Sequence, residues 1–571
     1  MTGATARAAL AVFVAAVAVY ANAIPNAFVV DDIHQVVEND WIMGVRHVPE
    51  IFSRGVWEFE GRSASYYRPL MYVFYMAAWS LVGLAPWGYH LLNVLLHAAA
   101  SVLVFAVAHR VLPGGAAPAR SPWLAAPFVA GLVFAVHPIH TESVAWVAGI
   151  ADVGMTVFGL LALWLYLVAD GRERVVMPLA ALSFLAATLF KEPGIVLPLV
   201  MLAYEATVRR DRWNTGRVAL RLAPFAIAGA VYVGLRVHAL GGFALTSAAP
   251  LTPGRHVLAL LALFAGYVEK LLVPVNQNFW HVFVPPESFG SPAAWTALAV
   301  VAAALTAAWI AARRSAVVSF GVMLVLLPLL PAFHIGALNQ GLENAFAERY
   351  LYFPSVGAAL LAGLAARHVT RLTAPRIAVP VLLVSLVITA GAVATVRRNT
   401  TWKNGLTLWT DAVGKSPGSA IARMNYGAAL LYAGRSEEGV RELRMAAGIQ
   451  PALVDRQIAL GAAYAGKGRV KQAILAFHTA LALDPRSAAA HYALGLIYEQ
   501  RGAVDRAILE YEAALALEPS YAEAHNNLGV LYAEQGRVDR ALPHFDAAAR
   551  LRPGDPDYRA NLARARGRPR P

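Results

Sequence analysis

The chain has 571 residues, of which 58% are hydrophobic and 15% are charged, and its mean hydropathy is +0.52. A soluble protein of this length could not keep so apolar a composition off its surface, so a wholly soluble fold is excluded. The absence of cysteine excludes disulfides and thiolate metal sites. The net charge is +13, but many arginines lie in short loops between apolar segments, so we predict no nucleic-acid partner.

Apolar segments fill the chain up to about residue 396, and a helix needs about 20 apolar residues to cross a bilayer. We predict eleven membrane-spanning helices, at about residues 8–25, 88–110, 123–137, 152–169, 175–190, 193–208, 218–237, 293–312, 315–332, 350–367 and 376–396. No small-residue cleavage site follows the first helix, so we interpret it as a retained helix and not as a signal peptide.

Short basic loops predict the orientation of these helices. With the N-terminus inside, every inside loop holds two or more arginines, as at Arg172 and Arg174. The segments predicted to lie outside are then 26–87, 138–151, 333–349 and everything after 396. Two other apolar stretches, 69–84 and 257–273, would invert this pattern if they crossed, so we predict that both lie in the outer interface.

Two adjacent acids, Asp31 and Asp32, come directly after the first predicted helix. Neighbouring carboxylates at a membrane surface repel each other and are costly to desolvate, which raises a pKa and suits a general base. The same pair could instead hold a divalent cation. The structural alternative is that both acids cap the short helix that follows.

The second outer loop concentrates polar groups at His137, His140, Glu142 and Asp152. Imidazole and carboxylate together suit several metals. There is no second cluster with the spacing of a structural zinc site, so we prefer a hydrogen-bonding role at the membrane surface for the two histidines.

Basic residues with acidic or aromatic neighbours stand at the outer ends of three predicted helices, namely Arg68, Lys191-Glu192 and Glu348-Arg349-Tyr350. An ion pair at a helix end is the ordinary interpretation. Lysine and arginine at an outer membrane surface also provide what a lipid phosphate needs, because a guanidinium binds phosphate oxygens in a bidentate way.

The last third of the chain is repetitive, with prolines every 34 residues at Pro417, Pro451, Pro485, Pro519 and Pro553. This is the length of a tetratricopeptide repeat (TPR), a helix–turn–helix unit. Its signature residues serve packing, so we assign binding to variable positions on the concave face, such as His491, His525, Asn526 and Asn527. The predicted fold is all-α, with a membrane domain over 1–396, a linker over 397–417, four repeats over 418–553 and a tail over 554–571.

Several short motifs resemble the transmembrane and tetratricopeptide repeat protein family and, more distantly, the multi-spanning glycosyltransferases of the C superfamily (GT-C). They run in family order, and the matching segments are Val30-Asp31-Asp32, Tyr67-Arg68-Pro69-Leu70, residues 88–93 with His97, His137 to Trp146, Lys191-Glu192 and Glu348 to Pro354. With the repeats, the resemblance covers nearly the whole chain.

The resemblance implies transfer of a sugar, usually mannose, from a polyprenyl monophosphate to Ser or Thr of proteins. It implies a catalytic acid at Asp31 or Asp32, with Asp32 as the better candidate for the base and Asp31 in support. Arg349 and Lys191, with Arg68, would bind the donor phosphate, because cations stabilise a leaving phosphate. We expect the remaining polar residues of these loops to support them, and we expect no metal cofactor.

Two other functions are compatible with the sequence. A non-catalytic membrane-anchored repeat scaffold explains the repeats but not the polar outer loops. A transporter of a lipid-linked substrate would carry charges near the centre of its helices, and the predicted spans have few. The lack of cysteine and the retained first helix favour a bacterial cytoplasmic membrane, with the repeats in the periplasm and protein acceptors or partners on their concave face. The alternative placement is the endoplasmic reticulum, with the repeats in its lumen. Because four repeats make a short arm, a small molecule or a lipid is the alternative to a protein acceptor.

Overall fold

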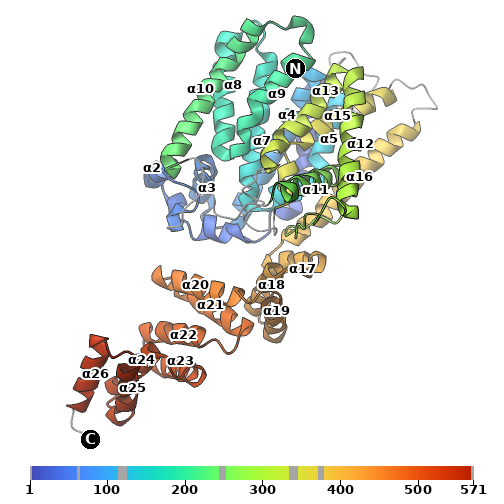
Figure 1. Cartoon of the computed structure of the whole chain (residues 1–571). Coiled ribbons are helices and arrows are strands. Elements are labelled where there is room, and N and C mark those ends of the chain that lie inside the picture. Colours follow the sequence, from blue (N-terminus) through green and yellow to red (C-terminus); the bar gives the residue numbers. More distant parts are fainter. Residues whose placement is uncertain are drawn as a thin grey trace. The chain divides into compact units, whose positions relative to one another are not determined.

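The computed structural model describes residues 3–60, 65–112, 125–242, 252–333, 345–370 and 378–567. Within these residues the regular elements are helices and no strand occurs, which confirms the predicted all-α class. The chain divides into two compact units, Met1–Lys415 and Ser416–Pro571 (Figure 1).

The first unit is a bundle of long apolar helices with shorter helices between them. Its α-helices are α1 (Gly3–Tyr20), α2 (Val48–Ser53), α3 (Pro69–Val82), α4 (Pro86–Val111), α5 (Ala126–Val136), α6 (Thr141–Ala145), α7 (Ile150–Val168), α8 (Glu173–Phe190), α9 (Leu197–Thr207), α10 (Thr215–Leu240), α11 (Pro253–Leu272), α12 (Pro292–Arg314), α13 (Ala316–Leu329), α15 (Ser355–Thr370), α16 (Ala378–Asn399) and α17 (Gly405–Lys415).

Eight helices in the described part of the chain are long and apolar enough to cross a membrane, in place of the eleven predicted. They are Gly3–Ala23, Pro86–Val111, Val147–Val168, Glu173–Phe190, Thr215–Leu240, Pro292–Arg314, Ala316–Phe333 and Val381–Trp402. A ninth span results if Ala126–Val136 and Pro138–Ala145, which meet at a bend of 45°, cross together.

Prolines explain why the other predicted spans are shorter than expected. Pro138 follows the end of α5 and begins a 3-10 turn, because proline cannot continue the hydrogen-bond ladder of a preceding helix. A 3-10 segment over Glu192–Val196 leaves α9 only 11 residues. Pro354 stands directly before α15, which has 16 residues. The stretches predicted to lie in the interface form α3 and α11, and neither is among the eight spans.

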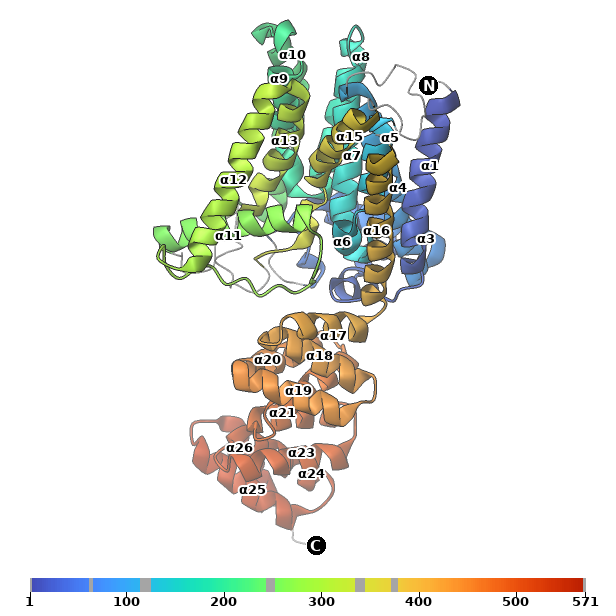
Figure 2. The same ribbon diagram turned by 90° about the vertical axis from the view of Figure 1, so that its right-hand side faces the viewer.

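The arginine-rich turns of the first unit gather at one end of the bundle. Figure 2 shows the start of α1, the α7–α8 turn and the α9–α10 turn at the same end, with α6 and α11 toward the other. Buried ions hold this end together, since Arg221 donates to Asp170 at 2.8 Å and lies 3.6 Å from Glu205. The tertiary structure therefore segregates the basic turns from the polar loops as the charge pattern predicts.

The second unit is a stack of helix pairs. Its helices are α18 (Ala420–Tyr432), α19 (Ser436–Ile449), α20 (Leu453–Gly466), α21 (Val470–Leu483), α22 (Ala488–Gln500), α23 (Val504–Leu517), α24 (Ala522–Glu534), α25 (Val538–Leu551) and α26 (Pro556–Arg566). The first eight pair consecutively into four helix–turn–helix units, as the 34-residue period predicts.

Glycines at two repeated positions shape each unit. A Cβ atom on Gly495 would lie 2.5 Å from the ring of Tyr511, so only glycine lets α22 approach α23 this closely. Gly502 has a φ of +68° in the turn between the same helices, a conformation that glycine adopts without a steric penalty.

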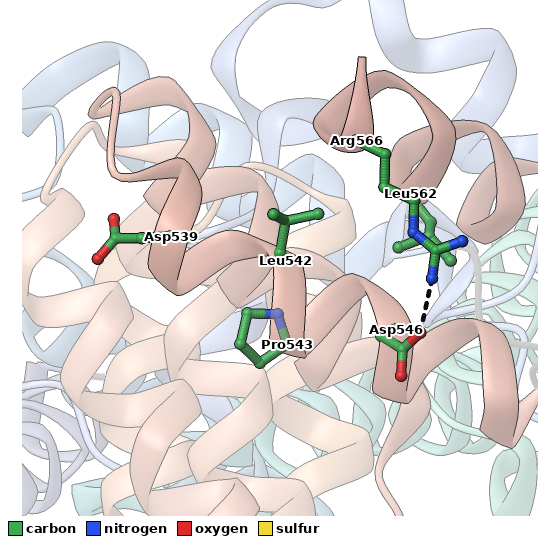
Figure 3. Close-up of a pocket in the computed structure, with 6 residues that line it drawn as sticks. All are labelled: Asp539, Leu542, Pro543, Asp546, Leu562 and Arg566. Carbon is green, nitrogen blue, oxygen red and sulfur yellow. Dashed lines mark hydrogen bonds and ion pairs between the residues drawn. The ribbon is translucent and has the colours of Figure 1, made fainter. Parts of the chain in front are cut away.

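The last helix, α26, resembles the first helix of a further repeat with a polar surface. Leu562 and Arg566 stand 34 residues after Leu528 and Tyr532. With α25 they line a pocket of about 580 Å³, across which Arg566 pairs with Asp546 at 3.2 Å (Figure 3). A polar outer helix of this kind keeps the apolar core of a solenoid from solvent.

Candidate functional site

The carboxylate of Asp32 is fully buried and holds two separate segments together. Its Oδ2 accepts a hydrogen bond from the Val29 N–H at 3.0 Å, and its Oδ1 accepts one from the Ala148 N–H at 2.8 Å. Burial raises the pKa of Asp32 to about 8, although the two backbone donors oppose this shift. Asp32 therefore ties the first loop to the segment that follows α6.

Asp31 lies in the same turn but is only half-buried. The preceding Val30 has a φ of +52°, which is strained for a β-branched side chain, and the π-helix Ile33–Val37 follows. Strain of this kind persists only where the surrounding structure enforces it, and it concentrates at functional sites. The turn thus leaves the two acids with different degrees of burial.

Each of the three predicted phosphate-binding cations is paired with a carboxylate that the sequence analysis also identified. Lys191 Nζ donates to Asp152 Oδ1 at 2.6 Å, and both side chains are at least nine-tenths buried. Arg68 donates to Glu192 Oε2 through Nε at 3.0 Å and Nη2 at 2.9 Å.

The third pair joins Arg349 to Glu142. The guanidinium of Arg349 donates to Glu142 Oε1, and its backbone N–H donates to Oε2 at 3.0 Å. These partners stand 207 residues apart in the chain, so the pairing is a tertiary feature. Buried charges of this kind depend on such partners, because an unpaired buried ion is strongly destabilising.

Aromatic rings and electrostatics bring the three cations into one group, which we call the cation cluster (Arg68, Lys191 and Arg349). Lys191 and Arg349 lie 5.2 Å and 5.3 Å from the ring centre of Tyr350. Burial, together with Arg68 and Arg349, lowers the pKa of Lys191 to about 8, although Asp152 opposes this shift. The three cations therefore lie close enough together to interact, and each is paired with its own carboxylate.

The segment after α6 connects the cation cluster to the acidic turn. The guanidinium carbon of Arg349 lies 5.6 Å from the ring centre of Trp146, and two residues later the Ala148 N–H donates to Asp32. Asn93 on α4 fixes this segment by donating to the Trp146 carbonyl at 2.8 Å. Asp32 and Arg349 therefore both contact the short segment Trp146–Ala148.

The two predicted histidines of the second outer loop lie apart from the cation cluster. His140 is fully buried and its Nε2 is 2.7 Å from Ser355 Oγ, while His137 Nδ1 accepts from the Ile139 N–H at 3.2 Å. Their contacts are hydrogen bonds and ring contacts with residues such as Phe134 and Tyr352. Glu348, which directly precedes Arg349, has other partners: it accepts from the Asn278 N–H at 2.8 Å and lies 3.0 Å from His281.

Arg236 is a member of this region that sequence reasoning missed. It lies on α10, 3.5 Å from Glu192, and donates to the Ser65 carbonyl at 2.9 Å. The sequence did indicate a role for Arg236, because an arginine within a predicted membrane span is costly unless it is paired. Arg236 thus holds both Glu192 and the backbone before Arg68.

Among the described residues, one group of three or more His, Asp or Glu side chains is close enough together to hold a metal ion, and it is formed by His34, Glu38 and Glu60. Burial lowers the pKa of His34, but hydrogen bonds to the two glutamates outweigh it and raise that pKa to about 9. The imidazolium and the carboxylates satisfy one another. The group includes neither Asp31 and Asp32 nor the histidines of the second outer loop.

This geometry suits chemistry in which an anion leaves while a proton is taken up. The acidic turn offers carboxylates, and the cation cluster offers charge-assisted hydrogen-bond donors. Such a combination matches group transfer from a phosphate ester to a hydroxyl.

Comparison with known proteins supports the assignment of both units. The tetratricopeptide repeat family matches residues 458–516 and 505–556. The chain is 27% identical to protein O-mannosyl-transferase Tmtc1 of Drosophila melanogaster, covering 76% of this chain and 60% of that one. It is 28% identical to protein O-mannosyl-transferase TMTC3 of Mus musculus, covering 76% and 50%.

A match over a shorter stretch has a higher sequence identity. Over 153 residues, which are 26% of this chain and 17% of the other, the identity to protein O-mannosyl-transferase TMTC2 of Homo sapiens is 37%. The chain spans between half and three-fifths of the length of the first two relatives. The chain is therefore an integral membrane protein with an all-α helical bundle followed by a TPR solenoid, and it is similar to proteins named protein O-mannosyl-transferases.

Proposed function

We propose that this chain is a membrane glycosyltransferase that transfers mannose from a polyprenyl-phosphate carrier to Ser or Thr hydroxyls of proteins. The relatives are named protein O-mannosyl-transferases, which supports the reaction class and the sugar. The observation that carries the proposal is the connection of the acidic turn to the cation cluster through the Trp146–Ala148 segment.

The reaction needs both the acidic turn and the cation cluster. The acceptor hydroxyl oxygen attacks the anomeric carbon of the sugar, and the bond between that carbon and the phosphate oxygen breaks. The hydroxyl proton passes to a carboxylate, and the electron pair of the broken bond leaves on the polyprenyl phosphate. Arg349, Lys191 and Arg68 stabilise the charge that grows on this phosphate.

Asp31 and Asp32 have different roles in this proposal. Both oxygens of Asp32 accept backbone N–H donors, and the side chain is fully buried. Asp31 is half-buried in the same turn. We therefore assign proton uptake to Asp31 and positioning of the turn to Asp32, which reverses the order that the resemblance implies.

The donor phosphate is neutralised by side chains in this proposal, and no metal takes part. The three cations of the cluster supply the positive charge that a metal would otherwise provide at the phosphate. We expect mannose transfer to be unchanged after the protein is treated with a chelator.

The membrane orientation belongs to the same proposal. In this proposal the basic turns gathered at one end of the bundle (Figure 2) lie inside, whereas the acidic turn and the cation cluster lie on the outer face, which in a bacterium is the periplasm. The repeats follow α16 in the chain and are proposed to lie on that same face. Protein acceptors or partners bind the concave face of the repeats, as tetratricopeptide solenoids provide extended concave surfaces.

The experiment is mannose transfer by the purified full chain, with radiolabelled polyprenyl-phosphate mannose and a protein acceptor. Wild type is compared with Asp31→Asn and Asp32→Asn, and with Asp40→Asn as a control because Asp40 is an exposed acid of the same loop. We expect transfer by wild type and the control, transfer reduced by about 10²–10⁴-fold in Asp31→Asn, and strongly reduced transfer in Asp32→Asn. Absence of turnover with every lipid-linked sugar would favour the membrane-anchored scaffold instead.

A further inference from the structure

A pair of side chains 19 residues apart joins the two helices of a repeat at one recurring position. In the first repeat Arg423 donates to Glu442 at 2.7 Å, and in the third His491 lies 2.7 Å from Glu510. In the fourth repeat both positions are histidine, and the Nδ1 atoms of His525 and His544 lie 2.9 Å apart. The fourth repeat thus replaces an ion pair with two imidazoles in the same place.

Hydrogen bonding fixes the tautomer of His525. Its Nε2 lies 3.1 Å from the Pro519 carbonyl oxygen, which only accepts, so Nε2 carries the proton. The Nδ1 atom of neutral His525 is then an unprotonated lone pair directed toward His544. Metal-binding histidines characteristically donate their other ring N–H to a carbonyl in this way.

We propose that His525 and His544 form a binding site for a divalent transition metal, Cu²⁺ or Ni²⁺, between α24 and α25. Imidazole nitrogens bind such metals at about 2.0–2.1 Å, and two nitrogens 2.9 Å apart then subtend roughly a right angle at the metal. A right angle suits the tetragonal geometry of Cu²⁺ and Ni²⁺, whereas tetrahedral Zn²⁺ requires the nitrogens to move apart.

The surroundings keep both imidazoles neutral, which metal binding requires. Burial lowers the pKa of His525, and nearby Arg550 adds to this. Burial and His525 lower the pKa of His544, although Glu512 opposes the shift. Both histidines are partly exposed, so solvent can supply the other ligands.

The charges near the site are already paired. Arg550 lies 3.1 Å from Asp546, and Glu512 accepts a hydrogen bond from the Tyr532 hydroxyl at 2.5 Å. The Tyr532 ring stacks against His544 with centroids 5.9 Å apart and limits the motion of that imidazole. A metal at this point replaces the hydrogen bond that His544 Nδ1–H donates to His525 Nδ1, because His544 then carries its proton on Nε2 and offers Nδ1 as a ligand.

The test uses isothermal titration calorimetry. Cu²⁺ is titrated into the full chain, which is kept in detergent and has first been treated with a chelator. Because the chain has 16 histidines, the measurement needs matched variants. We expect wild type to bind one Cu²⁺ tightly, and His525→Gln and His544→Gln each to weaken that site at least tenfold. His491→Gln is the control, because its partner is Glu510, and we expect it to bind like wild type.

Thermal unfolding provides a second measurement. Cu²⁺ stabilises a protein that binds it only when folded, so it should raise the Tm of wild type and of His491→Gln, and should not raise the Tm of the other two variants. The proposal is wrong if wild type binds no Cu²⁺, or if both His525→Gln and His544→Gln bind it with unchanged affinity. The pair would then be an N–H···N hydrogen bond alone.

Discussion

Lys191 and Asp152 form an ion pair of 2.6 Å in which neither side chain is more than 6% exposed. The pair joins the end of α8 to the first turn of α7, which places it between the two helices with the most extensive mutual packing in the bundle. Arg68 and Arg349 both lie close enough to lower the pKa of Lys191. The charge of Lys191 therefore depends on its neighbours.

This dependence predicts how donor binding changes with pH. The pKa of Lys191 is lowered to about 8, so its ammonium group is charged at pH 7 and largely neutral at pH 9. We expect the KM for the polyprenyl-phosphate sugar to rise several-fold between these values. In Lys191→Arg the charge persists, because guanidinium does not titrate in this range, and the rise should disappear. An equal rise in both proteins would contradict the assignment.

The two acids of the first loop should respond differently to amide substitution. Asp31→Asn removes the proposed base, so we expect kcat to fall by about 10²–10⁴-fold. Asp32→Asn turns an amide NH₂ toward one of the two backbone donors at Val29 and Ala148. We expect it to lose about 1–3 kcal/mol of stability as well as activity. Thermal melts in detergent separate the two roles, and a normal Tm for Asp32→Asn would exclude the positioning role.

Close packing in the third repeat predicts a steric effect at Gly495. In Gly495→Ala the new Cβ would meet the ring of Tyr511 at 2.5 Å, so we expect destabilisation of about 1–3 kcal/mol. Gly448 on α19 has no atom within 4 Å of its Cβ position, so Gly448→Ala should be neutral or stabilising by about 0.5–1 kcal/mol. Hydrogen exchange of the backbone amides of residues 488–517 measures the difference in stability between the two variants. Equal protection in both variants would contradict the prediction.

The absence of native cysteine makes the membrane orientation directly testable. A cysteine at Arg212, in the basic turn between α9 and α10, should react with an impermeant maleimide only from inside. A cysteine at Glu287, between α11 and α12, should react only from outside. Labelling of both from the same side would overturn the proposed orientation.

The period of 34 residues was sufficient to predict the repeats, because each tetratricopeptide unit packs mainly on its neighbours and its signature residues are local in sequence. The membrane helices were predicted less completely. Hydropathy identified apolar stretches, but prolines at positions such as Pro138 and Pro354 end or begin helices inside those stretches, so eight of the described helices are long enough to span.

The sequence by itself determined the residue types of the candidate site, since Arg68, Lys191 and Arg349 stood out at helix ends in polar outer loops. Only the tertiary structure decided their partners. Arg349 pairs with Glu142 from a loop 207 residues away, and Asp32 accepts a hydrogen bond from Ala148, 116 residues away. Ion pairs and buried hydrogen bonds depend on distances of a few ångströms, and those distances are set by helix packing, not by spacing along the chain.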